Sequence, residues 1–85
     1  MASGELLGKV THFFDKINVA VIRLDRTVRA GEPVHFLGRS TDFQQTVDSM
    51  QVEHQAVQEG APGTEVAVKV LQPVRAGDSV YRAGG

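Results

Sequence analysis

The sequence predicts a small domain built from β-strands, and three features indicate this fold class. Two runs of β-branched and aromatic residues, at 7–14 and 19–24, flank a short polar segment. A phrase rich in turn residues at 28–34 returns at 74–80. The segment 65–71 places valine at every second position. Short runs of this kind, bounded by turn residues, are typical of strands in a sheet.

The first two runs are expected to pair as a hairpin. Residues 15–18 read Asp-Lys-Ile-Asn, and both Asp and Asn favour turns. Ala20, Ile22 and Leu24 share one face of the second strand, while Val19 and Val21 share the other. Because both faces are apolar, we expect a sheet that curls around a core or is covered on its second side.

The repeated phrase predicts two tight turns, each followed by a strand. Residues 28–34 read Val-Arg-Ala-Gly-Glu-Pro-Val, and residues 74–80 read Val-Arg-Ala-Gly-Asp-Ser-Val. Glycine adopts positive φ without steric cost, so it suits the end of such a turn. The strands that follow are expected at 34–37 and 80–82. Between the copies, Ala-Pro-Gly-Thr at 61–64 and Gln-Pro at 72–73 bound the alternating strand at 65–71.

Residues 41–60 are open to two interpretations from their pattern alone. A helix fits the spacing of the apolar stripe, with Thr41 or Asp42 as N-cap and Gly60 as C-cap. The stripe consists of Phe43, Val47, Met50, His54 and Val57. A strand fits if a β-bulge near residues 48–49 changes which face points inward, but periodicity alone slightly favours the helix.

Composition limits the classes of function. The 85 residues are 41% hydrophobic, contain no cysteine and have a net charge of −1. This excludes disulfide frameworks, cysteine-based zinc sites and thiol nucleophiles. The longest aliphatic run, 19–22, is far shorter than the roughly 20 residues needed to span a bilayer. We therefore expect one soluble cytoplasmic domain over residues 1–85, with short flexible ends and no membrane association.

The charges are unevenly distributed along the chain. Residues 16–39 have a net charge of +3, whereas residues 40–68 contain five acids and no Lys or Arg. A local basic patch attracts an anionic partner even when the total charge is near zero. The candidate nucleic-acid-binding residues are therefore Lys16, Arg23, Arg26, Arg29 and Arg39. An ordinary solvated surface would carry as many charges.

Two adjacent aromatic residues near these bases are candidates for stacking on nucleobases. Phe13 and Phe14 follow His12 and precede Lys16, and aromatic side chains beside a cation are common in single-stranded RNA sites. With only five aromatic residues in the chain, the core needs most of them, and burial of both rings in the core is the favoured alternative.

Several segments together resemble the second domain of translation elongation factors of the Tu/1A type. They are Gly-Lys-Val at 8–10, the hairpin, and the segments 28–31, 47–54, 61–68 and 74–78. The sequence is similar in particular to free-standing bacterial proteins described as translation elongation factor-like. The resemblance implies an all-β fold, a small closed antiparallel six-stranded β-barrel of the translation-factor domain 2 type. The barrel would cover residues 7–82, with 43–54 as one long bent strand.

The resemblance implies a non-catalytic binding module that associates with RNA or the ribosome. The chain contains no Gly-x-x-x-x-Gly-Lys-[Ser/Thr] loop, so we expect no GTP binding. Where the factors have an acid that helps to hold the aminoacyl end of tRNA, this chain has Gln51. A similar barrel is appended to collagenase-like peptidases, and the alternative is therefore a protein–protein interaction module with a protein partner.

We expect no catalytic residue, metal site or cofactor. His12, His35 and His54 are not at ligand spacing with one another or with an acid, and no Gly-x-Ser-x-Gly elbow is present. The sequence ends in Gly84 and Gly85. A diglycine end resembles that of ubiquitin-like modifiers and sulfur carriers, which is a third and different hypothesis.

Overall fold

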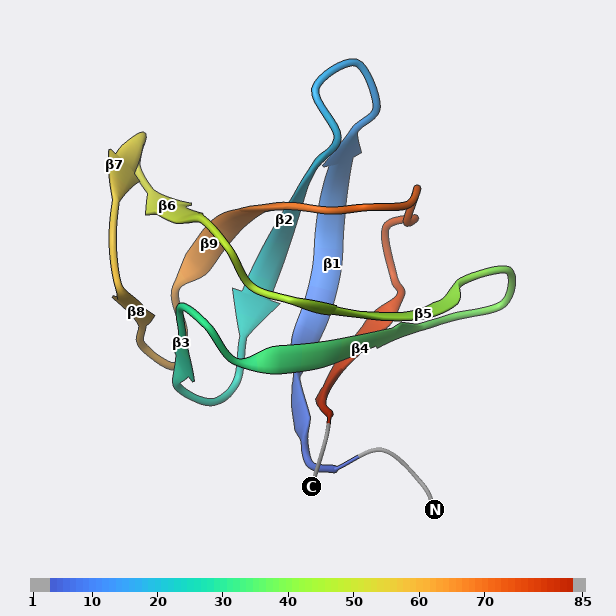
Figure 1. Cartoon of the computed structure of the whole chain (residues 1–85), viewed down its shortest axis with the longest axis horizontal. Coiled ribbons are helices and arrows are strands. Elements are labelled where there is room, and N and C mark those ends of the chain that lie inside the picture. Colours follow the sequence, from blue (N-terminus) through green and yellow to red (C-terminus); the bar gives the residue numbers. More distant parts are fainter. Residues whose placement is uncertain (1–3, 84–85) are drawn as a thin grey trace.

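The structure is a computed structural model that describes residues 4–83, and it is made of strands joined by turns (Figure 1). The described strands are β1 (Leu6–Phe14), β2 (Val19–Leu24), β3 (Val28–Arg29), β4 (Pro33–Leu37), β5 (Asp42–Thr46), β6 (Met50–Val52), β7 (Gln55–Ala56), β8 (Glu59–Gly60), β9 (Glu65–Lys69) and β10 (Ser79–Arg82). Eight of them form one antiparallel sheet in the order β5-β4-β10-β1-β2-β9-β6-β7, and β3 pairs with β8.

The predicted hairpin is confirmed as β1 and β2. Its register places Phe14 opposite Val19 and Val10 opposite Ile22, with a shift between Val10 and His12. Asn18, at the end of the turn, has φ 56°, a left-handed conformation that Asn tolerates better than most residues. Turn chemistry at 15–18 was therefore a sound guide to local structure.

The repeated phrase forms two equivalent turns, as predicted. Gly31 has φ 94° and Gly77 has φ 96°. In the first turn the Arg29 amide donates to Glu32 Oε1 at 2.8 Å, and in the second the Arg75 amide donates to Asp78 Oδ2 at 2.8 Å. The strands that follow, β4 and β10, lie side by side and pair antiparallel. The repeat thus places two copies of one turn-and-strand unit next to each other in the sheet.

The ambiguous segment 41–60 is extended, so the helical interpretation is wrong. β5 pairs with β4, and β6 pairs with β9, with an interruption at residues 47–49 where a bulge was expected. One bent segment therefore joins the two ends of the sheet, and Figure 1 shows it crossing the front of the molecule. The buried Gln45 bridges the remaining gap: its amide donates to Lys69 O and accepts from Leu71 N, each at 2.8 Å.

The prediction of a closed six-stranded barrel is not confirmed. Within the described residues, strand pairing runs from β5 to β7 without returning to its start, and the main sheet has eight strands. The difference arises at β5, which meets the β9 end of the sheet through the Gln45 side chain rather than through a backbone ladder. All-β architecture with antiparallel pairing is what the structure does show.

The core lies inside the curl of the sheet. Phe36 of β4 and Phe43 of β5 stack at its centre, with ring centroids 5.1 Å apart and an interplanar angle of 19°. The alternating strand is confirmed as β9, where Val66 and Val68 are each 1% exposed. In residues 4–83, no helix is long and apolar enough to cross a membrane.

Candidate functional site

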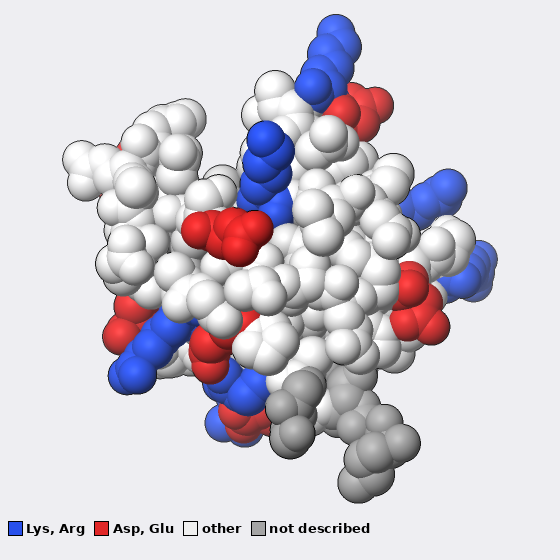
Figure 2. All heavy atoms as spheres, in the orientation of Figure 1, with Lys and Arg blue, Asp and Glu red and all other residues white. Residues whose placement is uncertain are grey.

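A groove with a volume of about 870 Å³ lies on the outer face of the sheet. It runs over β2 and β9, between the tip of the β1–β2 hairpin and the β6–β7 hairpin. Figure 2 shows the notch between these two projecting hairpins. Its size is within the range of about 300–1,000 Å³ that is usual for ligand sites.

Strand register explains the floor of the groove. Val21 of β2 is paired with Ala67 of β9, which is paired in turn with Gln51 of β6. Side chains of paired residues project from the same face of a sheet. Val19, Val21 and Ala67 are half-buried, because the flanking hairpins cover them only in part. The floor is therefore apolar, formed by small side chains and still partly open to solvent.

The walls combine apolar and charged side chains. On the hairpin side, Phe14 is 51% exposed and Ile17 is 61% exposed. The opposite wall is formed by Val52 together with Glu53 and His54. Exposed aromatic and aliphatic side chains that rim a concave surface are typical of interaction sites.

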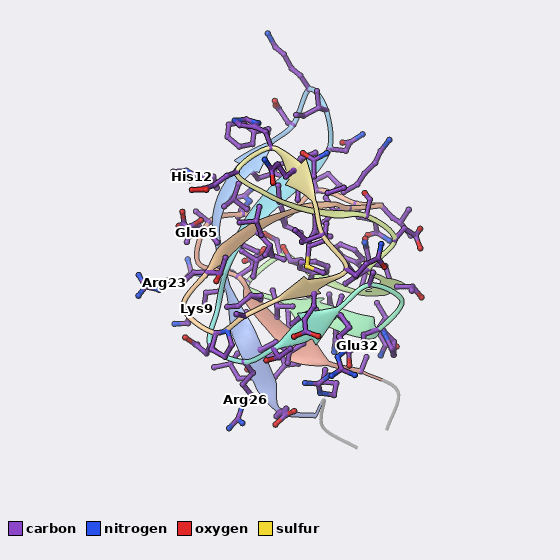
Figure 3. The ribbon with its side chains drawn as sticks, turned by 90° about the vertical axis from the view of Figure 1, so that its left-hand side faces the viewer. Lys9, His12, Arg23, Arg26, Glu32 and Glu65 are labelled. Carbon is purple, nitrogen blue, oxygen red and sulfur yellow. The ribbon has the colours of Figure 1, made fainter. Side chains whose placement is uncertain are left out.

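One end of the groove is charged. Arg23 of β2 lies opposite Glu65 of β9, and both line the groove. Figure 3 shows these two side chains and Lys9 on the same side of the molecule, directed away from the ribbon. Within residues 4–83, no ion pair closer than 4.0 Å engages Arg23, Glu53 or Glu65. All three remain available to a partner.

The structure does not bring the five predicted basic residues together. Lys16 lies in the turn after β1, and Arg39 lies in the turn between β4 and β5. Arg26 pairs with Glu5 at 3.4 Å, and Arg29 pairs with Glu59 at 3.1 Å across the small sheet. Of the five, Arg23 lines the groove.

The two predicted stacking residues point in different directions. Phe13 packs against the core, whereas Phe14 lines the groove. Adjacent residues on a strand alternate faces, so one ligand cannot lie against both rings. The Phe14 ring is also 6.3 Å from that of His12, at an interplanar angle of 34°.

The groove does not present a preassembled catalytic pair. His35 Nε2 lies 2.6 Å from Asp42 Oδ1, but these residues belong to β4 and β5 and do not line the groove. Within residues 4–83, no three His, Cys, Asp or Glu side chains cluster as a metal site would require. Gly84 and Gly85, on which the diglycine hypothesis depends, lie outside the described residues.

Comparison with known proteins finds a similarity to one protease. No family model matches the chain. Over 76 residues it is 36% identical to an uncharacterized protease of Methanocaldococcus jannaschii, and this alignment covers 88% of the chain. The same alignment covers 19% of the protease, so the chain spans about a fifth of the length of this curated relative.

Solved structures show the same fold in a peptidase domain. The selenomethionine variant of the C-terminal domain of a candidate U32 peptidase from Geobacillus thermoleovorans superposes with a TM-score of 0.88 at 21% identity. That match covers 92% of this chain and 99% of the other. A second structure of this C-terminal domain gives a TM-score of 0.89 at 20% identity, covering 94% and 93% of the two chains.

These findings correct the assignment made from sequence. The resemblance to the second domain of elongation factors was wrong, because the similarities lead to a protease and to the C-terminal domain of a U32-type peptidase. The interpretation as a translation-factor-like, RNA-binding protein depended on this resemblance and is also wrong. Its physical basis was also weak, since the basic residues that suggested it are dispersed or paired with acids.

The sequence did contain one signal for the groove. Val19 and Val21 made the second face of their strand apolar, and these are the residues that form the floor. The wall residues Glu53 and His54 gave no comparable signal, because nothing in their spacing indicates a two-residue turn between β6 and β7.

Proposed function

We propose that this chain is a non-catalytic interaction module of the kind appended to U32-type peptidases, and that it docks an extended polypeptide segment in the groove. The similarity to a protease and to a peptidase C-terminal domain supports the first part of the proposal, a module of the kind appended to peptidases. The observation that carries the proposal is the half-buried apolar floor between two exposed walls. A polypeptide is the partner that such a surface suits best, since alternate side chains of an extended segment can pack on the floor.

The non-catalytic part of the proposal rests on the arrangement of the groove side chains. Glu53, His54 and Glu65 are the acid–base groups of the lining. Within the described residues, no hydrogen bond or ion pair joins any two of them or orients them. Acid–base catalysis requires such groups to be held within hydrogen-bond reach of the proton that is transferred.

The test measures peptide binding by the whole chain. A positional-scanning library of fluorescein-labelled nonapeptides is titrated against the wild-type protein by fluorescence polarisation. We expect apolar residues to be selected at alternate positions, with Kd in the micromolar range.

A substitution in the floor supplies the matched comparison. Ala67→Gln places a larger polar side chain in the groove, and we expect it to weaken binding about tenfold, a change of about 1.4 kcal/mol, with the Tm nearly unchanged. Leu71→Gln alters a residue that is 75% exposed outside the groove, and it should bind like wild type. The proposal fails if no peptide binds below about 1 mM, or if Ala67→Gln binds as tightly as wild type.

A further inference from the structure

The turn between β6 and β7 has an unusual backbone. Val52 is paired with Gln55, so the connection consists of two residues, Glu53 and His54. Their φ angles are 51° and 66°, so both are in the left-handed region. Two-residue hairpins of this type strongly favour Asn-Gly, because most side chains disfavour positive φ.

The rest of the chain follows that preference. Elsewhere in residues 4–83, positive φ occurs at Gly31, Gly63, Gly77 and Asn18, which are residues suited to it. The Glu53-His54 turn departs from this preference, because neither residue is Gly or Asn. Non-glycine residues in this conformation cost stability and persist where the surroundings hold them, most often at sites of function.

Both residues of this turn line the groove. Each is exposed, and the structure records no ion pair for the Glu53 carboxylate within the described chain. Together with Glu65 it gives the lining two carboxylates against the single guanidinium of Arg23. This charge balance complements a basic side chain in the bound segment.

We propose that the Glu53-His54 turn is the recognition element of the groove, retained at a cost in stability because Glu53 contacts a Lys or Arg of the docked segment. The partner is therefore an extended polypeptide with apolar residues for the floor and a basic residue for this wall. The inference rests on the proposed docking function and adds the chemistry of the partner.

The double variant Glu53→Asn/His54→Gly tests the turn directly, since it installs the favoured residues. It should raise the Tm by about 4 °C or more, as expected when strain of about 1 kcal/mol is relieved in a domain of this size. Two labelled peptides serve as probes, identical except for a central Val-Lys-Val or Val-Glu-Val. The wild type should prefer the Lys peptide at least fivefold, and the double variant should lose that preference.

Single substitutions separate charge from backbone. Glu53→Gln keeps the turn, so it should lose the Lys preference without the gain in Tm. If the double variant keeps the Lys preference, or shows no rise in Tm, the inference is overturned while docking stands. If Ala67→Gln leaves the binding of both peptides unchanged, the docking function itself is overturned.

Discussion

Phe36 shows how much a single side chain contributes to this domain. It is fully buried, and its ring stacks on Phe43 at the point where β4 and β5 cover the core. Replacing it with alanine removes the largest buried side chain and leaves a cavity that the short strands around it can close only in part.

We expect Phe36→Ala to lower the free energy of unfolding by about 3–5 kcal/mol in urea denaturation. Phe14→Ala is the matched control, because that ring is 51% exposed and should cost less than about 1 kcal/mol. If Phe14 serves docking, its loss weakens peptide binding and leaves the fold intact. Equal destabilisation by the two substitutions would contradict this division between core and groove.

At the scale of elements, one side chain connects β5 to the segment that contains Lys69 and Leu71. β5 has its described strand partner on one side, and Gln45 makes the connection on the other by satisfying Lys69 O and Leu71 N. These bonds are partly buried, so leaving both backbone groups without a partner would cost more than an exposed hydrogen bond is worth.

We expect Gln45→Leu to lose about 1–3 kcal/mol of stability, measured by chemical denaturation. Gln45→Glu should also be destabilising, because a carboxylate can accept from Leu71 N but cannot donate to Lys69 O. Gln44→Leu, at the exposed neighbouring position, provides the comparison and should be nearly neutral. The bridging role would be contradicted by a stable Gln45→Leu variant.

Elements whose signals are local were predictable from sequence. The hairpin, both glycine turns, the alternating strand and the break at residues 47–49 follow from turn chemistry and period. The pairings of β4 with β10 and of β3 with β8 were not predictable, because they join residues about 30 or more positions apart and no pattern records them. The groove depends on another distant pairing, that of β2 with β9, so only its floor left a trace in the sequence.

The assignment from sequence failed at the scale of the whole molecule for a related reason. Glycine turns and valine-rich strands in a similar order satisfy the needs of any small curled sheet, so they do not distinguish one such domain from another. Charge counted along the chain was equally uninformative, because Arg26 and Arg29 are partnered across the fold by Glu5 and Glu59.

In the whole molecule, the floor of the groove lies on internal strands of the sheet, whereas the wall at β6–β7 lies at its edge. β2 and β9 are internal strands with a partner on each side, whereas β7 is a two-residue edge strand whose residues are both exposed. The backbone hydrogen bonds of short edge strands with few buried contacts break at a low free energy of local unfolding. Those of internal strands break only at a free energy close to that of global unfolding. We therefore expect slow amide exchange in β2 and β9 and fast exchange across residues 52–57.

A docked peptide should change this pattern at the wall. Hydrogen–deuterium exchange on the intact chain, with and without the Val-Lys-Val peptide, is expected to show new protection at residues 52–57. Residues of the β3–β8 sheet lie outside the groove lining and should exchange as before. Because binding stabilises only the states that bind, protection should increase with peptide concentration until the site saturates. Protection gained chiefly at β3–β8 or at the β4–β5 turn would place the binding surface elsewhere on the molecule.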